Sequence, residues 1–310
     1  MEFQVNLLKR PFNLDNTLEC GQVFRWKKKD NWWIAVVENR VIKINQENNV
    51  LNIKSSSSDT DEKFIRKYLR LADSLPDILA SINKDRLMTD TISKLYGLRL
   101  IKQNPWECLA SFICATYKNI TAIQKMISNI CQQLGQSIDF EGDIYYTFPE
   151  PKIIANADRQ TLENCGLGYR AKYLQKTAKQ VSSKEVVLED LSVLNYETVK
   201  CILLENKNMV KVLPGVGPKV ADCVMLFSLD KLEAFPIDVW IRRIIKEHYI
   251  HLINSRPNYL SSNLIDESIG NAEYGVISDA MRSYFGAYAG YAQEYLYHYT
   301  RMPKITSFTS

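Results

Sequence analysis

The first hundred residues alternate short apolar runs with polar turns. Four of the runs are rich in β-branched and aromatic residues, and turn-forming pairs such as Asp30-Asn31 and Glu38-Asn39 separate them. The runs are residues 23–26, 32–37, 40–44 and 50–53. They predict an antiparallel β-sheet, and two helical segments at 63–72 and 76–83 are expected to pack against it.

From about residue 100 onward the spacing of apolar residues is helical. Residues 105–115 predict a buried helix, the segment 117–120 breaks it, and residues 121–134 resume as an amphipathic helix. Polar stretches at 182–184 and 254–264 predict loops. The further predicted helices cover 198–209, 218–229 and 278–300. The pattern therefore favours an N-terminal sheet followed by a mainly helical region.

A glycine-bracketed turn precedes the helix predicted at 218–229. Gly215 and Gly217 flank a single valine, and Pro218 suits the first helical position because its missing N–H is not needed there. The first N–H groups of a helix have no internal partner, and the helix dipole is positive at that end. The turn could hold a phosphate, although a purely structural corner between two helices would use the same glycines.

Two charged residues follow this turn, and each has a simple and a chemical interpretation. Lys219 could be a solvated surface lysine, but it stands in the phosphate-binding corner, where its amine could reach the sugar of a bound nucleotide. Nucleophilic attack requires a neutral amine, which burial or an adjacent cation can favour. Asp238 precedes an apolar helical run and is predicted to cap that helix. A carboxylate placed there could also stabilise an oxocarbenium-like charge.

Composition narrows the class of protein only modestly. The 310 residues are 46% hydrophobic and 24% charged, with a net charge of +4, which permits DNA binding without demonstrating it. The basic run Lys27-Lys28-Lys29 is expected to be a solvated hairpin tip, with a place at a DNA edge as the alternative. We find no apolar run of membrane-spanning length and no signal peptide, so we expect a cytoplasmic protein, associated with the nucleoid if the source is prokaryotic.

The cysteines and histidines give no sign of a metal site. Seven cysteines, an odd number in apolar settings, suggest reduced thiols in a cytosol, and no CxxC pair occurs. No cysteine lies beyond Cys223, and the three histidines do not form a convincing set of ligands.

The stretch from Leu213 to Arg243 carries a resemblance to a known family. LPGVGPKVADC followed by PIDVWIRR, with Lys219 and Asp238 nineteen residues apart, resembles the helix-hairpin-helix Gly/Pro-Asp motif of base-excision DNA glycosylases, and more narrowly that of the 8-oxoguanine DNA glycosylase/AP lyases. The resemblance implies an α+β protein. An N-terminal antiparallel sheet domain with flanking helices is expected over 1–100. A two-part helical domain is expected over 101–310, with the helix-hairpin-helix at about 198–229.

The same resemblance implies a pocket for the damaged base. The segment Cys20 to Trp26 is similar to the family segment in which a glycine carbonyl, here that of Gly21, accepts a hydrogen bond from N7–H of 8-oxoguanine. Normal guanine has no hydrogen at N7, so one backbone oxygen can discriminate the lesion. Gln293 would read the Watson–Crick edge, and the base would stack between Tyr297 and Cys223. From the residues alone, Gly21 is a turn glycine and Tyr297 a core aromatic.

A second group of residues is implied to contact the DNA around the flipped nucleotide. In the family the break between the two helices, here with Tyr117 and Asn119, inserts into the duplex. Tyr169 and Arg170, from the similar family segment 168–173, are assigned with them to the wedge and the opposite base. Animal enzymes usually place asparagine at position 117 and a cytosine-reading arginine at position 122, where this chain has tyrosine and Ala122. We therefore predict looser selectivity for cytosine opposite the lesion.

The implied activity is that of a bifunctional DNA repair glycosylase. Lys219 would form a Schiff base as 8-oxoguanine leaves, Asp238 would stabilise positive charge, and backbone amides near Gly215, Gly217 and Val220 would hold a phosphate. The chemistry needs no cofactor. The expected partner is double-stranded DNA containing 8-oxoguanine, with no membrane, bound by a monomer. The alternatives are a noncatalytic helix-hairpin-helix DNA-binding module and a glycosylase for another damaged purine.

Overall fold

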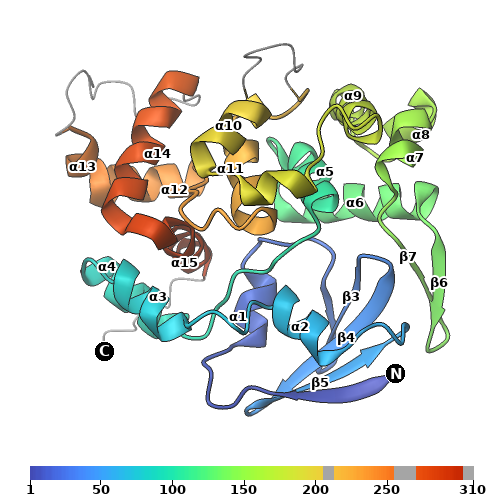
Figure 1. Ribbon diagram of the computed structural model, residues 1–310, viewed down its shortest axis with the longest axis horizontal. Coiled ribbons are helices and arrows are strands. Elements are labelled where there is room, and N and C mark those ends of the chain that lie inside the picture. The colour runs from blue at the N-terminus through green and yellow to red at the C-terminus, as the bar shows by residue number, and fades with distance from the viewer. Residues whose placement is uncertain (205–212, 255–269, 303–310) are drawn as a thin grey trace, which may run out of the picture.

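The computed structural model describes residues 1–204, 213–254 and 270–302. The N-terminal part is a five-stranded antiparallel sheet with strand order β1-β5-β4-β3-β2. Its strands are β1 (Glu2–Asn6), β2 (Lys27–Lys29), β3 (Trp32–Val37), β4 (Arg40–Glu47) and β5 (Val50–Ser55). Helices α1 (Leu14–Glu19) and α2 (Glu62–Tyr68) share one apolar core with the sheet (Figure 1).

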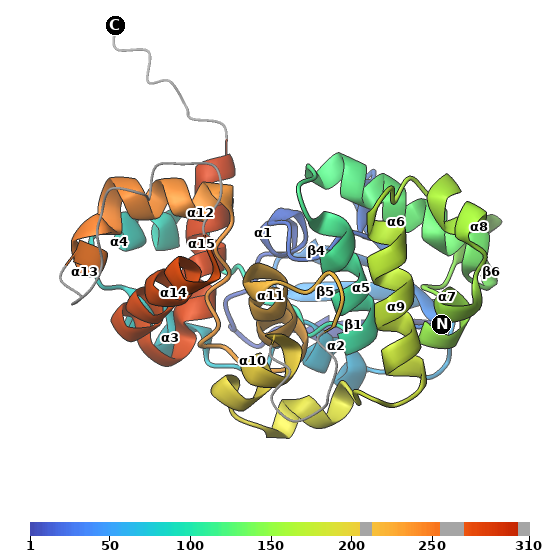
Figure 2. The ribbon, with the colours of Figure 1, turned by 90° about the horizontal axis from the view of Figure 1, so that it is seen from above.

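The rest of the described chain is helical apart from one small hairpin of two strands. A first group of elements comprises α5 (Pro105–Ala115), α6 (Ile120–Leu134), β6 (Ser137–Phe140), β7 (Asp143–Tyr146), α7 (Pro151–Asn156), α8 (Arg159–Asn164) and α9 (Arg170–Ser182). A second group comprises α3 (Leu75–Ile82), α4 (Arg86–Lys94), α12 (Val239–Ile244), α13 (Ile250–Asn254), α14 (Asn271–Phe285) and α15 (Ala289–Arg301). Figure 2 shows α10 (Tyr196–Leu204) and α11 (Pro218–Ser228) between the two groups.

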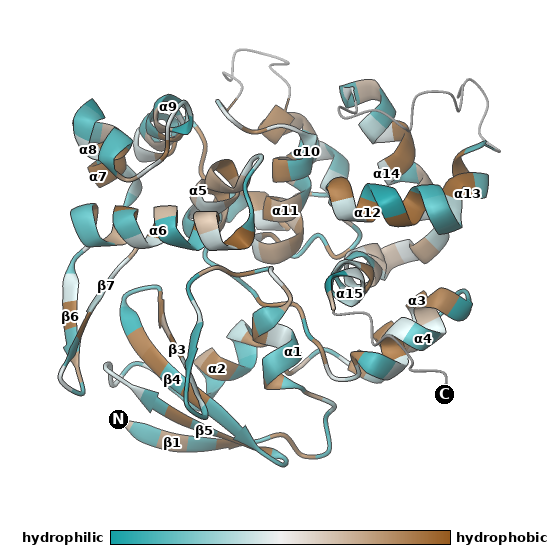
Figure 3. Ribbon diagram, turned by 180° about the vertical axis from the view of Figure 1, so that it is seen from behind, coloured by the Kyte–Doolittle hydropathy of each residue, from teal (hydrophilic) through white to brown (hydrophobic). Residues whose placement is uncertain are grey.

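Short irregular turns complete the helical part. Residues Glu189–Val193 and Gly286–Tyr288 form 3-10 helices, and Ile245–Tyr249 forms one π-helical turn between α12 and α13. Helices α5 and α11 lie at the centre of the helical part, and most of their side chains are buried (Figure 3). In α11 every side chain from Val220 to Ser228 is buried, so the helix that carries Lys219 has a rigid setting.

Several predicted elements differ from the structure. Residues 23–26 are not a strand, because their side chains reach the helical part: Phe24 packs edge-on against Phe112, and Arg25 pairs with Glu107. The strand that pairs with β3 is instead the lysine run, which is exposed along the sheet edge. The prediction gave no element at β1, α1, α4, the β6–β7 hairpin, α7, α8, α9 or α13.

Two predicted helices also need correction. The helix expected at 76–83 exists as α3, but its buried face joins the core of the helical part and not that of the sheet. The helix expected at 278–300 is two helices, because Gly286 adopts φ +77 and ends α14 before α15 begins. The ends of the segments predicted at 198–209 and 254–264 lie outside the described residues.

Candidate active site

Lys219 lies near the N-terminus of α11, as the sequence predicted. Gly217 occupies the cap position, Pro218 is the first helical residue, and no side chain caps the helix. The half-buried Lys219 side chain places Nζ 4.8 Å from the centroid of the Phe112 ring, which is itself stacked on Phe227. The buried aromatic pair therefore fixes where the amine lies, and the first N–H groups of α11 remain open for an anion.

The turn before α11 is held from the side by α9. Gly215 has φ +83, and a Cβ there would lie 2.9 Å from Cβ of Tyr173 and 3.3 Å from Ile113, so only glycine fits. The Thr177 hydroxyl donates to the Pro214 carbonyl at 2.8 Å. Gly217, in contrast, is exposed and has open space where a Cβ would be. The backbone at Gly217 can thus be approached closely from outside, as a phosphate site requires.

Asp238 caps α12 and also interacts electrostatically with Lys219. Its Oδ1 accepts hydrogen bonds from the N–H groups of Trp240 and Ile241, both at 2.9 Å. Dense surroundings raise the pKa of the Asp238 carboxyl, while those two N–H groups and the positive charge of Lys219 act in the opposite direction. The capping interpretation and the chemical one are compatible, because one carboxylate caps the first turn of α12 and interacts with the charge of Lys219.

A tyrosine on α14 joins the elements that carry Lys219 and Asp238. Asp222, fully buried on α11, accepts hydrogen bonds at 2.7 Å from the hydroxyls of Tyr196 and Tyr274. The Tyr274 hydroxyl in turn accepts a hydrogen bond from the Ile237 N–H at 3.1 Å, one residue before Asp238. This link was not predicted, since nothing in the sequence pairs position 222 with position 274. It fixes the spacing between the lysine helix and the aspartate turn.

The predicted base-recognition residues come from distant parts of the chain. Gly21 has φ +102, and a Cβ there would lie 3.2 Å from Cε1 of Tyr297. Burial raises the pKa of the Tyr297 hydroxyl, which also interacts electrostatically with Asp238. Cys223 is 3% exposed, and burial raises the pKa of its thiol to about 12, opposed by the charge of Lys219. Tyr297 therefore lies against Gly21, and charge interactions connect Tyr297 and Cys223 with the catalytic pair.

Gln293 and its neighbour Glu294 lie buried in α15, one turn before Tyr297. Gln293 is 4% exposed, and its Oε1 has no hydrogen-bond partner among the described residues. Burial raises the pKa of the Glu294 carboxyl to about 7, and the nearby Cys20 thiol and the charge of Arg301 act in the opposite direction. An unpaired buried amide oxygen is costly unless a ligand satisfies it, which fits the predicted contact between Gln293 and a base.

The predicted DNA wedge residues divide into exposed and buried ones. Tyr117 is 86% exposed at φ +54, and Tyr169 is 56% exposed. Asn119 caps α6 by accepting a hydrogen bond from the Ala122 N–H at 2.9 Å. Arg170 is 4% exposed, and its Nε donates to the Thr116 carbonyl at 3.1 Å. In this structure the guanidinium holds the wedge loop, and the two tyrosines are the residues presented outward.

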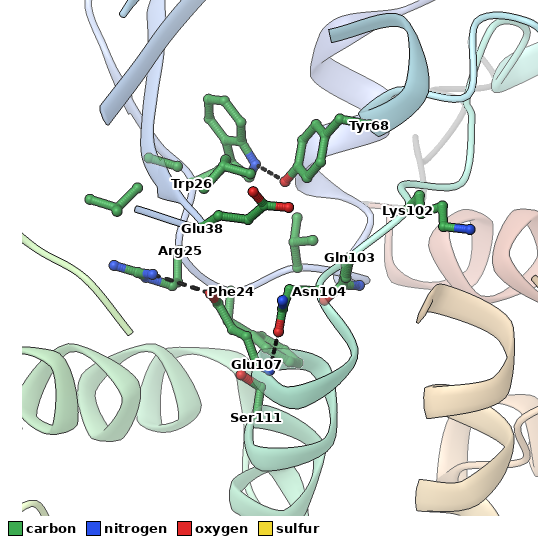
Figure 4. Close-up of a pocket in the computed structure, with 14 residues that line it drawn as sticks. Phe24, Arg25, Trp26, Glu38, Tyr68, Lys102, Gln103, Asn104, Glu107 and Ser111 are labelled. Carbon is green, nitrogen blue, oxygen red and sulfur yellow. Dashed lines mark hydrogen bonds and ion pairs between the residues drawn. The ribbon is translucent and has the colours of Figure 1, made fainter. Parts of the chain in front are cut away.

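A pocket at the junction of the sheet and α5 lies apart from these residues (Figure 4). Its polar groups are largely paired with one another: Trp26 donates to the Tyr68 hydroxyl at 2.9 Å, and Arg25 pairs with Glu107. None of its lining residues belongs to the predicted site. We therefore interpret it as the packing seam between the sheet and the helical part.

The described residues contain no group of His, Cys, Asp and Glu that could hold a metal ion. In the same part of the chain, every helix is too short or too polar to cross a membrane.

Comparison with known proteins agrees with this geometry. The family described as the N-terminal domain of 8-oxoguanine DNA glycosylase matches residues 4–109, and the HhH-GPD superfamily of base excision DNA repair proteins matches residues 110–264. The chain is 30% identical to the N-glycosylase/DNA lyase of Saccharomyces cerevisiae, over 92% of this chain and 82% of the yeast protein.

Two solved structures have the same fold over nearly their whole length. MBOgg1, in complex with a low affinity DNA ligand, is 31% identical with a TM-score of 0.83, covering 97% of this chain and 95% of that one. The apo form of the Clostridium acetobutylicum 8-oxoguanine glycosylase/lyase is 29% identical with a TM-score of 0.80, covering 96% of each chain. The chain therefore belongs to the 8-oxoguanine DNA glycosylase family of the HhH-GPD superfamily.

Proposed function

We propose that Lys219 is the nucleophile of this enzyme and that Asp238 is its charged partner. The protein is a bifunctional DNA repair enzyme, an 8-oxoguanine N-glycosylase with DNA lyase activity, like the relatives named N-glycosylase/DNA lyase. One observation carries the assignment of residues: Lys219 lies at the open end of α11 and interacts electrostatically with Asp238, and both charges act on the buried Cys223 thiol. Tyr297, which lies against Gly21, also interacts with Asp238.

In the first chemical step the neutral amine of Lys219 attacks C1′ of the damaged nucleotide. The bond between C1′ and N9 breaks, and the base leaves with the bonding electrons and takes up a proton. The Asp238 carboxylate stabilises the positive charge that develops on the sugar. Opening of the sugar ring then gives a Schiff base between C1′ and Nζ.

The second step uses the same covalent intermediate. Loss of a proton from C2′ expels the 3′ phosphate by breaking the bond between C3′ and oxygen, which nicks the strand 3′ to the lesion. Hydrolysis of the Schiff base restores Lys219. One amine therefore serves both activities.

The proposed partner is double-stranded DNA carrying 8-oxoguanine. The Clostridium relative has been solved in complex with double-stranded DNA containing cytosine opposite 8-oxoguanine. In this chain, the open N–H groups of α11 near Gly215, Gly217 and Val220 suit a backbone phosphate, and Tyr117 suits a wedge because it is almost fully exposed.

We also propose a monomer that acts in the cytoplasm, at the nucleoid if the source is prokaryotic. Sedimentation with and without duplex tests the monomer.

Borohydride trapping tests the proposed nucleophile. With a duplex containing one 8-oxoguanine, the wild type should form a covalent adduct and Lys219→Gln should form none. Binding of Lys219→Gln to the same duplex should stay within about threefold of wild type, since the first turn of α11 is unchanged. An adduct that persists in Lys219→Gln would show that another residue attacks.

The same assay separates the alternative functions. A noncatalytic DNA-binding module would bind the duplex and trap nothing with any lesion. A glycosylase for another damaged purine would trap on that lesion and not on 8-oxoguanine. Undamaged duplex is the control for both.

A further inference from the structure

The last described helix ends in an arginine that reaches the N-terminal part. Arg301, at the end of α15, donates from Nη1 to the Cys20 carbonyl at 2.9 Å, across 281 residues of sequence. Its guanidinium carbon also lies 4.8 Å from the centroid of the Tyr297 ring, one helical turn earlier. One side chain thus contacts both the segment that presents Gly21 and the aromatic ring expected to stack on the base.

The fit around Gly21 is tight. A Cβ built on Gly21 would lie 2.8 Å from Nη1 of Arg301, 3.2 Å from Cε1 of Tyr297 and 3.3 Å from Ile120. The positive φ of this residue already favours glycine. The guanidinium therefore occupies the place that a side chain at position 21 would need, and it packs directly against the recognition backbone.

Charge interactions from α15 reach the same segment. The buried Glu294 carboxyl interacts electrostatically with the Arg301 guanidinium and with Cys20, whose thiol donates to the Thr17 carbonyl at 3.2 Å. Cys20 is held at its side chain by Thr17 and at its carbonyl by Arg301. The Cys20 carbonyl belongs to the peptide group that joins Cys20 to Gly21, so the orientation of Gly21 depends on this contact.

We infer that Arg301 is a positioning residue for recognition of the damaged base. It aligns the Gly21 backbone with the Tyr297 ring, so that the carbonyl and the aromatic face act on the same flipped base. The inference rests on the function proposed above, because it assigns Arg301 to base recognition and not to the chemistry of Lys219.

The separation of base recognition from the Lys219 chemistry can be measured. Excision of 8-oxoguanine needs both the pocket and the Lys219 chemistry, whereas nicking of a preformed abasic site needs only the chemistry, because no base is present. Loss of Arg301 should therefore weaken the first activity and spare the second.

The test compares Arg301→Ala and Arg301→Lys with wild type on two duplexes, one with 8-oxoguanine and one with an abasic site. For Arg301→Ala we expect kcat/KM on 8-oxoguanine to fall about tenfold or more, the effect of losing a charge-assisted hydrogen bond. Nicking of the abasic duplex should stay within about twofold. Arg301→Lys keeps a charged donor without the planar stack and should fall in between. Arg159, an exposed arginine paired only with Glu163 on α8, gives the control Arg159→Ala.

Each remaining outcome has a distinct meaning. Equal losses on both duplexes would overturn the inference, because Arg301 would then support the whole fold or the chemistry. An unchanged rate on 8-oxoguanine would overturn it as well. Failure of the wild type to act on 8-oxoguanine while it nicks the abasic duplex would refute the proposed substrate, and a base excised from another lesion with the same dependence on Arg301 would keep the positioning role.

Discussion

The catalytic corner and the base pocket are built in opposite ways. The corner, from Gly215 to Asp238, comes from one continuous stretch, and its two charged residues sit at helix N-termini fixed by a turn and a cap. The pocket joins Gly21 from near the start of the chain to Tyr297 and Arg301 from near its described end. Chemistry is therefore encoded locally, while the choice of base depends on how distant parts of the chain pack.

Because of this difference, the pocket depends more than the corner on how the N-terminal part packs against the helical part. The N-terminal part is held to the helical part by contacts such as Arg25 with Glu107 and Arg70 with Asp230. A change that shifts this packing should move Gly21 relative to Tyr297, whereas the turn and the cap that place Lys219 and Asp238 lie within the helical part. Base recognition should thus be more sensitive to remote substitutions than lyase chemistry.

The strongest test of the corner is Asp238→Asn. Asparagine keeps an oxygen that accepts from the Trp240 and Ile241 N–H groups, so the helix cap should survive while the charge is lost. We expect base excision to fall by about two to three orders of magnitude, the usual effect of removing one group that stabilises transition-state charge. Single-turnover kinetics measures the loss, and thermal unfolding should change little. A tenfold loss or less would leave Asp238 as a cap alone.

Glu294→Gln tests the buried charge under the pocket. In the folded protein its pKa is raised to about 7 from 4.5, so folding favours the protonated acid. This contribution to stability is fully present below about pH 4.5 and is lost as pH rises through about 7, a difference of roughly 3 kcal/mol. Glutamine does not titrate, so the stability of Glu294→Gln relative to wild type should increase as pH rises across this range. Denaturant unfolding from pH 4.5 to 8 measures it, and parallel curves for the two proteins would contradict the prediction.

Gly21→Ala tests the pocket itself. The added Cβ would press against the Arg301 guanidinium and Tyr297, at a φ that alanine disfavours, so about 1–3 kcal/mol of stability should be lost. Excision of 8-oxoguanine should fall about ten- to hundredfold, while nicking of an abasic duplex falls far less. Equal losses of activity on the two substrates would contradict the proposal that Gly21 acts in base recognition and not in the chemistry of the corner.

Tyr274→Phe tests the link that spaces the two catalytic elements. It removes one of the two tyrosine hydroxyls that donate to Asp222 and leaves the Ile237 N–H without its acceptor. We expect a loss of about 1–3 kcal/mol in stability and a slower reaction on both 8-oxoguanine and abasic duplexes. Tyr196→Phe is the matched control, because it also removes a donor to Asp222 but does not touch Ile237. Similar kinetics in the two variants would argue against a spacing role.

The sequence predicted best where the signals are local. The first and last residues of α5, the start of α11 at Pro218 and the cap at Asp238 all follow from proline, glycine and capping chemistry within a few residues. The fold class followed in the same way, since sheet-like and helical spacing occupy different parts of the chain.

The misses share a different cause. Residues 23–26 have strand composition, yet contacts with the helical part decide their conformation, and α3 joins a core far away in sequence. Tyr274 and Arg301 act through partners 52 and 281 residues away, which no local pattern reveals.

The smallest expected effect concerns the base opposite the lesion. Ala122 is too short to reach that base, and the Arg170 guanidinium is bound inside the protein, so this structure offers no exposed arginine at either position. We predict that excision rates opposite C, A, G and T differ by less than about tenfold, or roughly 1.4 kcal/mol. Ala122→Arg should sharpen the preference for cytosine without changing abasic nicking. A strong cytosine preference in the wild type would contradict this prediction. It would mean that Arg170 leaves its carbonyl partners when DNA binds and reaches the opposite base.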